Sequence, residues 1–132
     1  MKFVINTDGG ARGNPGPAGV GVVIVDTSGV IVGQYKKYIG TATNNSAEYQ
    51  ALILGLKEAR RMGAESLEVR MDSELIVRQM QGRYKIKEPA LKILAGEALG
   101  LIQQFKSVNF KHVPREENKA ADKLVNQAID EG

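Results

Sequence analysis

The order of strand-like and helix-like segments constrains the fold of this chain most. The N-terminal part holds three strand-like, β-branched segments, at 2–7, 19–26 and 30–38. Helical and strand-like segments then follow in turn, with helices predicted at 45–62, 73–80, 89–105 and 117–129 and strands at 66–71 and 107–113. Five strands with interspersed helices predict an α/β fold, a mixed sheet flanked by helices on its faces.

The composition is that of one compact domain. The chain has 132 residues, of which 42% are hydrophobic, so we expect a single domain over 1–132 with its own core. No apolar run is long enough to span a membrane, no signal-peptide pattern is present and there is no cysteine, so we expect a cytoplasmic protein in a reducing compartment. The net charge is 18 − 15 = +3, which favours an anionic partner only weakly, since a mildly basic soluble protein explains it equally well.

Two aspartates follow strand-like segments. Asp8 ends the first predicted strand and Asp72 ends the fourth, and in each strand the even-numbered residues share a face. If these strands are parallel neighbours, both carboxylates leave the same end of the sheet, where α/β sheets bind ligands. Either aspartate alone could equally be a turn or helix-capping residue, because Asp72 and Ser73 directly precede a predicted helix.

Two further carboxylates lie on apolar helix positions. Glu48 shares a helical stripe with Leu52 and Leu56, and Asp122 lies near the apolar edge of the last predicted helix. The alternative for Glu48 is a capping box in which Asn45 is the N-cap residue. An unpaired buried charge is costly, and metal ligation would explain both placements.

Together the four carboxylates would form an oxygen-rich cage. Mg²⁺ prefers such ligands, and two ions about 4 Å apart can activate a water molecule and stabilise a leaving oxygen on a phosphodiester. The residues therefore lead to the hypothesis of metal-dependent phosphodiester hydrolysis.

The glycine-rich segment 8–19 is a poor match to a dinucleotide fingerprint, because a strand follows it and Pro15 and Pro17 forbid a helix. It is either a flexible connector or a loop whose backbone approaches a nucleic-acid strand closely. Asn44 and Asn45, at the mouth of the first predicted helix, either cap it or donate to bases or phosphates.

Basic residues offer further contacts. A basic segment that includes Arg83, Lys85 and Lys87 is either a solvated face or a set of phosphate contacts. His112 is the only histidine, and Arg115 follows Pro114 in a predicted loop from which it can reach a reacting phosphate.

Four segments in this order resemble type 1 ribonuclease H, over nearly the whole chain. They are Thr7–Gly19, Thr43–Leu52, Met71–Val77 and His112–Asp122. The resemblance implies a ribonuclease H-like five-stranded mixed sheet flanked by helices.

The resemblance also implies an activity and its site. It implies an endonuclease that cuts the RNA strand of an RNA–DNA hybrid and leaves 5′-phosphate and 3′-hydroxyl ends. Two Mg²⁺ or Mn²⁺ ions would be held by the four carboxylates, Asp8, Glu48, Asp72 and Asp122. The same motifs imply contacts with the hybrid, including a DNA phosphate at Thr43, and the residues assigned to these contacts are Gly9, Gly10, Asn14, Thr43, Asn44, Asn45 and Ser73.

The chain departs from many family members at two places. The segment 82–89 is short and lacks tryptophan, where they have a long basic protrusion. Many members have a mobile histidine before the last aspartate, and here both Arg115 and His112, which lies ten residues before Asp122, are candidate catalytic residues. Of the two, we assign assistance in product release to Arg115.

Two alternative functions are kept. One is a nuclease of the same fold that also cuts double-stranded RNA, and the other is a nucleic-acid-binding module without turnover. The four intact acids argue against the second, since clustered negative charge weakens phosphate binding. We expect a monomer.

Overall fold

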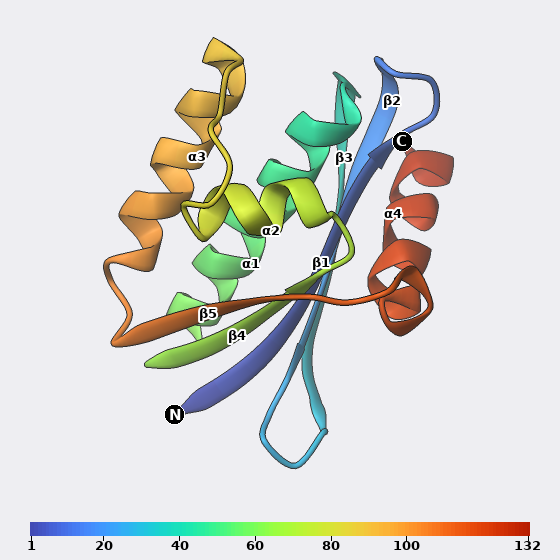
Figure 1. The fold of residues 1–132 in the computed structure, drawn as a ribbon. Helices are drawn as coiled ribbons and strands as arrows, with labels where there is room; N and C mark the ends of the chain where they lie inside the picture. Colours follow the sequence, from blue (N-terminus) through green and yellow to red (C-terminus); the bar gives the residue numbers. More distant parts are fainter.

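The computed structural model describes residues 1–132 and has a five-stranded mixed sheet in the order β3-β2-β1-β4-β5 (Figure 1). The strands are β1 Lys2–Ala11, β2 Gly16–Val25, β3 Ile31–Ala42, β4 Ser66–Met71 and β5 Ser107–His112. β2 pairs with β1 and β3 in antiparallel fashion, whereas β4 pairs with β1 and β5 in parallel. The predicted fold class is confirmed.

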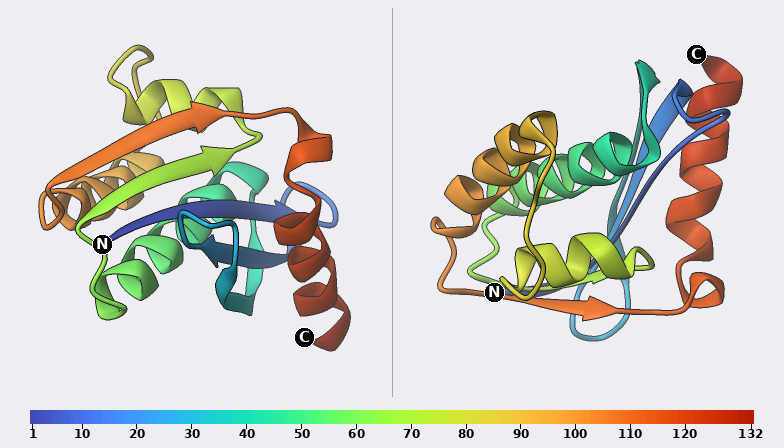
Figure 2. Two further views of the ribbon diagram at one scale, coloured as in Figure 1. Left: turned by 90° about the horizontal axis from the view of Figure 1, so that it is seen from below. Right: turned by 45° about the horizontal axis from the view of Figure 1, so that its top comes forward.

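The helices cover both faces of this sheet. They are α1 Asn44–Arg61, α2 Glu74–Met80, α3 Pro89–Ile102 and α4 Lys119–Glu131. α1, α2 and α3 lie on one side and α4 lies alone on the other (Figures 1 and 2). None of these helices combines the length and the apolar character that a membrane crossing requires.

The main core lies between the sheet and α1. Phe3, Ile5 and Thr7 alternate along β1 and are buried on the α1 side, as the period of two along a strand requires. On the opposite face α4 packs directly on glycine: a Cβ atom at Gly21 would lie 2.4 Å from the carbonyl oxygen of Ala121. The absence of a side chain there lets α4 approach the sheet closely enough for its residues to reach the end of β1.

The first strand is longer than predicted. Most of the glycine-rich segment 8–19 is paired sheet, with Gly9 opposite Val20 and Gly10 opposite Gly19. Only residues 12–15 remain as a connection, so Asp8 lies inside β1 rather than at its end. The prediction failed because glycine indicates a loop from propensity alone, whereas pairing with β2 satisfies its backbone groups.

Other boundaries differ by a few residues. β4 has its predicted bounds, α3 ends three residues early at Ile102, and the last helix begins at Lys119 after a 3₁₀ turn over Arg115–Glu117. β1 and β4 are parallel neighbours, with Asn6 opposite Arg70, so Asp8 within β1 is level with Asp72, which directly follows the end of β4. This confirms the expected placement of the two aspartates.

Candidate active site

A cleft of about 560 Å³ opens where β1, the N-terminus of α1, the end of β4 and the side of α4 meet. All four predicted carboxylates, Asp8, Glu48, Asp72 and Asp122, line it. The other predicted residues that line it are Gly9, Gly10, Asn44, Asn45, Ser73 and Arg115. The fold thus collects residues from all four sequence motifs around one opening.

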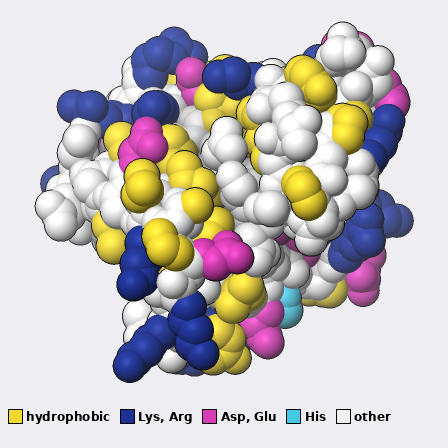
Figure 3. All heavy atoms as spheres, turned by 90° about the horizontal axis from the view of Figure 1, so that it is seen from above, with side chains coloured by type: hydrophobic (Ala, Val, Ile, Leu, Met, Phe, Trp, Pro, Cys, Tyr) yellow, Lys and Arg dark blue, Asp and Glu magenta, His cyan; other side chains and the backbone are white.

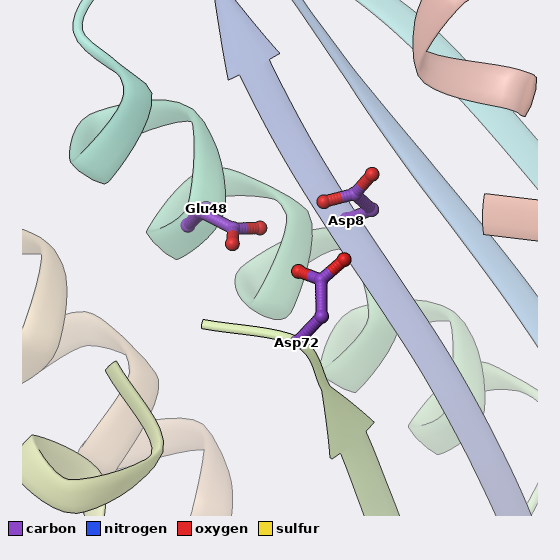
Figure 4. A group of neighbouring side chains, drawn as sticks. All are labelled: Asp8, Glu48 and Asp72. Atoms are coloured by element: carbon purple, nitrogen blue, oxygen red, sulfur yellow. The ribbon is translucent and has the colours of Figure 1, made fainter. Parts of the chain in front are cut away.

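Three of the carboxylates form a tight group. Oxygen atoms of Asp8, Glu48 and Asp72 lie within 4.8 Å of one another, and Figure 4 shows the three side chains converging from β1, α1 and the end of β4. Asp122 lines the same cleft but is not part of this group of three. It comes from α4, which lies on the face of the sheet opposite to α1 (Figure 1).

Glu48 is held in place by the backbone of β1. Its Oε1 atom accepts a hydrogen bond of 2.7 Å from the backbone N–H of Gly9. A Cβ atom at Gly9 would lie 2.2 Å from the carbonyl oxygen of Ala47, so only glycine permits this close approach of β1 to α1.

The capping alternatives for Glu48 and Asp72 are wrong. The N-cap residue of α1 is Thr43, whose hydroxyl accepts from the backbone N–H of Ser46, so Asn45 does not cap the helix. α2 is likewise capped by Ser73 and not by Asp72. Both carboxylates are therefore free of helix-capping roles and point into the cleft.

The three grouped carboxylates destabilise one another as anions. Burial, followed by the charge of Asp72, raises the pKa of Asp8 to about 8. Burial and the neighbouring Asp8 and Asp72 charges raise the pKa of Glu48 well above its usual range, although the Gly9 N–H opposes this. Burial also raises the pKa of Asp72.

The raised pKa values of the three carboxylates indicate that their negative charges lack a positive partner. A divalent cation would remove the repulsion among three convergent carboxylates, and hard carboxylate oxygens are ligands that Mg²⁺ and Mn²⁺ prefer. The acidic cluster therefore fits a metal ion.

Two of the predicted asparagines, Asn14 and Asn44, make hydrogen bonds that support the local structure. Asn44 Oδ1 accepts from the N–H of Ala11 at 2.8 Å, and the N–H of Asn44 donates to Asn14 Oδ1 at 3.0 Å. These bonds fasten the β1–β2 connection to the start of α1. Asn14 and Thr43 do not line the cleft, whereas Asn44 and Asn45 do.

Arg115 lines the cleft and His112 does not. The Arg115 guanidinium lies 3.8 Å from Asp122 Oδ1 at the mouth of the cleft, and its side chain is 80% exposed. His112 is the last residue of β5, its Nδ1 lies 3.9 Å from Glu74 Oε2, and it does not line the cleft. His112 therefore lies outside the cleft, and its catalytic role stays a prediction.

The basic segment also lies away from the cleft. Arg83, Lys85 and Lys87 are exposed in the connection between α2 and α3, and none of them lines the opening. Their role in phosphate contact stays a prediction.

Two residues at the site were not predicted from the sequence. Arg12 lines the cleft and forms an ion pair of 2.6 Å with Asp130 of α4. Asn118 is 1% exposed, and its side chain is bonded to β1. Asn118 falls in the first turn of the helix predicted at 117–129, so no local signal set it apart.

The comparisons with known proteins agree with this geometry. A family model described as reverse transcriptase-like matches residues 6–128. A bifunctional protein of Mycobacterium tuberculosis is 51% identical over 132 residues, covering 98% of this chain and 36% of that protein. The chain therefore spans about a third of the length of that relative.

Two solved structures match the whole fold. The crystal structure of ribonuclease H1 from the archaeon Halobacterium salinarum has a TM-score of 0.98 and 41% identity, and the alignment covers 100% of both chains. LC11 ribonuclease H1, solved in complex with an RNA/DNA hybrid, has a TM-score of 0.94 and 51% identity, and the alignment covers 98% of this chain and 97% of that one. With its motifs, sheet order and acidic cleft, this chain belongs to the type 1 ribonuclease H family.

Proposed function

We propose that the protein is an endonuclease that hydrolyses the RNA strand of RNA–DNA hybrids. The observation that carries the proposal is the convergence of Asp8, Glu48 and Asp72 within 4.8 Å beside an open cleft. Family membership supports the choice of reaction, and the relative solved with an RNA/DNA hybrid supports the choice of substrate.

The ribonuclease H family depends on metal ions, and we propose two Mg²⁺ or Mn²⁺ ions in this cleft. Asp8, Glu48 and Asp72 would hold them with the help of Asp122, which faces the cleft from α4. When bound, such ions activate a water molecule and stabilise the departing 3′ oxygen, so that the products carry 5′-phosphate and 3′-hydroxyl ends. The carboxylates themselves would position the metal ions and would not transfer protons.

The walls of the cleft suit a polyanionic strand. Asn44 and Asn45 are at the N-terminus of α1, where backbone N–H groups favour phosphate. Arg115 carries a permanent charge at the mouth and can bind a phosphate through two N–H groups. Lys and Arg side chains lie mostly around the margin of the face seen in Figure 3, and such exposed cations attract a polyanion.

The choice between duplexes depends on shape. A protein tells an RNA strand from DNA by its 2′-hydroxyl groups and tells a hybrid from other duplexes by groove width. The short segment 82–89 leaves double-stranded RNA as the competing substrate. One chain supplies all four carboxylates, so we propose a monomeric enzyme, which light scattering after gel filtration tests.

The test uses labelled duplexes of one sequence. RNA–DNA, RNA–RNA and DNA–DNA duplexes are incubated with the protein in Mg²⁺, in Mn²⁺ or in EDTA. We expect cleavage of the RNA strand in the hybrid, only with metal, and products that carry 5′-phosphate ends.

Two variants make the result specific to the site. Asp8→Asn should abolish cleavage, whereas Glu97→Gln, which removes an exposed acid that pairs with Lys57 outside the cleft, should leave it unchanged. Binding of the hybrid without cleavage in either metal would replace the proposal with a binding module. Equal cleavage of RNA–RNA duplex would replace the hybrid-specific proposal with a broader nuclease.

A further inference from the structure

We infer that Asn118 is a positioning residue that fixes Asp122 relative to Asp8 through its buried side-chain amide and its place at the start of α4. The inference rests on the proposed function, because it concerns the same acidic cluster. It assigns a role to a residue that does not line the cleft.

The side chain of Asn118 ties the C-terminal region to β1. Its Nδ2 atom donates to the carbonyl oxygen of Thr7 at 2.9 Å, and Thr7 directly precedes Asp8. Its Oδ1 atom accepts from Nδ2 of Asn6 at 3.0 Å. Asn118 is 1% exposed, so water does not replace these bonds.

The backbone of Asn118 connects the same point to Asp122. Asn118 is the N-cap residue of α4, and its carbonyl oxygen accepts from the N–H of Asp122 at 3.1 Å. An asparagine at this position usually bonds the first turn of its own helix through its side chain. Here the side chain makes no such bond and is directed to β1 instead. Local capping therefore does not account for this residue.

The two side-chain bonds fix the orientation of the amide. The nitrogen donates to Thr7 and the oxygen accepts from Asn6, and a flipped amide would turn its oxygen toward the Thr7 carbonyl oxygen. Because the backbone of Asn118 is bonded to Asp122, these bonds link the position of Asp122 to the part of β1 next to Asp8.

A residue that orients metal ligands without binding the metal affects the metal affinity of the site. Removing such a partner typically lowers metal affinity or activity about 10-fold to 100-fold. We therefore expect Asn118→Ala to weaken Mn²⁺ binding, measured by calorimetry without substrate, by about tenfold or more. The Mg²⁺ concentration that gives half-maximal cleavage should rise by a similar factor, with partial recovery of the rate at saturating metal.

The control is Gln79→Ala, matched for the loss of a hydrogen bond. Gln79 on α2 accepts from the Tyr49 hydroxyl at 2.7 Å and lies outside the cleft. It should lower the melting temperature of the metal-free protein, as Asn118→Ala does, without changing Mn²⁺ affinity. A merely structural role for Asn118 would make the two variants alike in both measurements.

A second variant covers the case in which Asn118→Ala does not fold. Asn6→Ala removes the donor that orients the Asn118 amide and leaves the carboxylates untouched. It should weaken Mn²⁺ binding in the same direction by a smaller factor, and unchanged affinity would overturn the inference. If the wild-type protein binds no Mn²⁺, the proposed function fails and the inference fails with it. If it binds Mn²⁺ and Asn118→Ala binds equally well, only the inference fails.

Discussion

Replacing Asp8 with asparagine should abolish cleavage and stabilise the metal-free protein. The amide has the shape of the carboxyl group but carries no charge beside Asp72 and Glu48. The pKa of Asp8 rises from its usual 3.8 to about 8, chiefly through burial and next through the Asp72 charge. Because one pKa unit corresponds to about 1.4 kcal/mol, the whole shift sets an upper limit of about 6 kcal/mol.

The net gain is smaller than this limit. Asparagine is also a polar group in a buried position, and its own desolvation offsets part of the relief. We therefore expect the free energy of unfolding to rise by about 2 kcal/mol at pH 8, or by about 7 °C in melting temperature for a chain of this size.

The stability gained by Asp8→Asn should depend on pH, because Asp8 titrates differently in the folded and the unfolded chain. Between about pH 4 and pH 8 the unfolded chain releases the Asp8 proton while the folded chain retains it, so wild-type stability falls as the pH rises. The advantage of Asp8→Asn should be near zero at pH 4 and largest at pH 8. Thermal unfolding in EDTA at pH 4, 6 and 8 measures it, with Glu97→Gln as the control for loss of an exposed charge. A variant that is no more stable than wild type at pH 8, or a gain independent of pH, would refute the reasoning.

Three further predictions concern the metal and the basic residues. Mg²⁺ should raise the melting temperature of the wild-type protein more at pH 8 than at pH 5, because protons compete for the carboxylates; an equal effect at both pH values would contradict metal binding there. Arg115→Ala should lower kcat on a hybrid about tenfold or more, roughly 1.4 kcal/mol, and His112→Ala should lower it less; the reverse order between pH 7 and pH 9 would reassign the role. Alanine at three exposed basic positions should flatten the salt dependence of hybrid binding by a slope of up to about 0.9 per lost contact, and an unchanged slope would mean a solvated face. These positions are Arg83, Lys85 and Lys87.

The pairing of Asp8 with Asp72 could be predicted from the sequence because it follows from a short-range rule. Side chains alternate along a strand, so the parity of the residue number decides the face once two strands are parallel. The same kind of local periodicity placed Glu48 on the buried side of α1, where the structure has it. Both inferences needed only neighbouring residues and the repeat of each element.

The errors came from contacts between distant segments. Gly9 and Gly10 are strand residues because β2 pairs with them, and nothing in segment 8–19 itself indicates that pairing. Asn118 bonds to Thr7 across 111 residues, a contact that no local signal marks. His112 lies in β5, as the sequence predicted, but its position beside Glu74 and outside the cleft depends on a contact with α2 that no local signal marks.

The docking of α4 on its own face of the sheet has a consequence for synthesis of the protein. The ribosome completes Asp8, Glu48 and Asp72 before it reaches Asn118 and Asp122. When the segments of β1, α1 and β4 have been made, the chain still lacks the wall of the cleft that α4 supplies. The cleft therefore stays incomplete on the ribosome until α4, which supplies Asp122, is made.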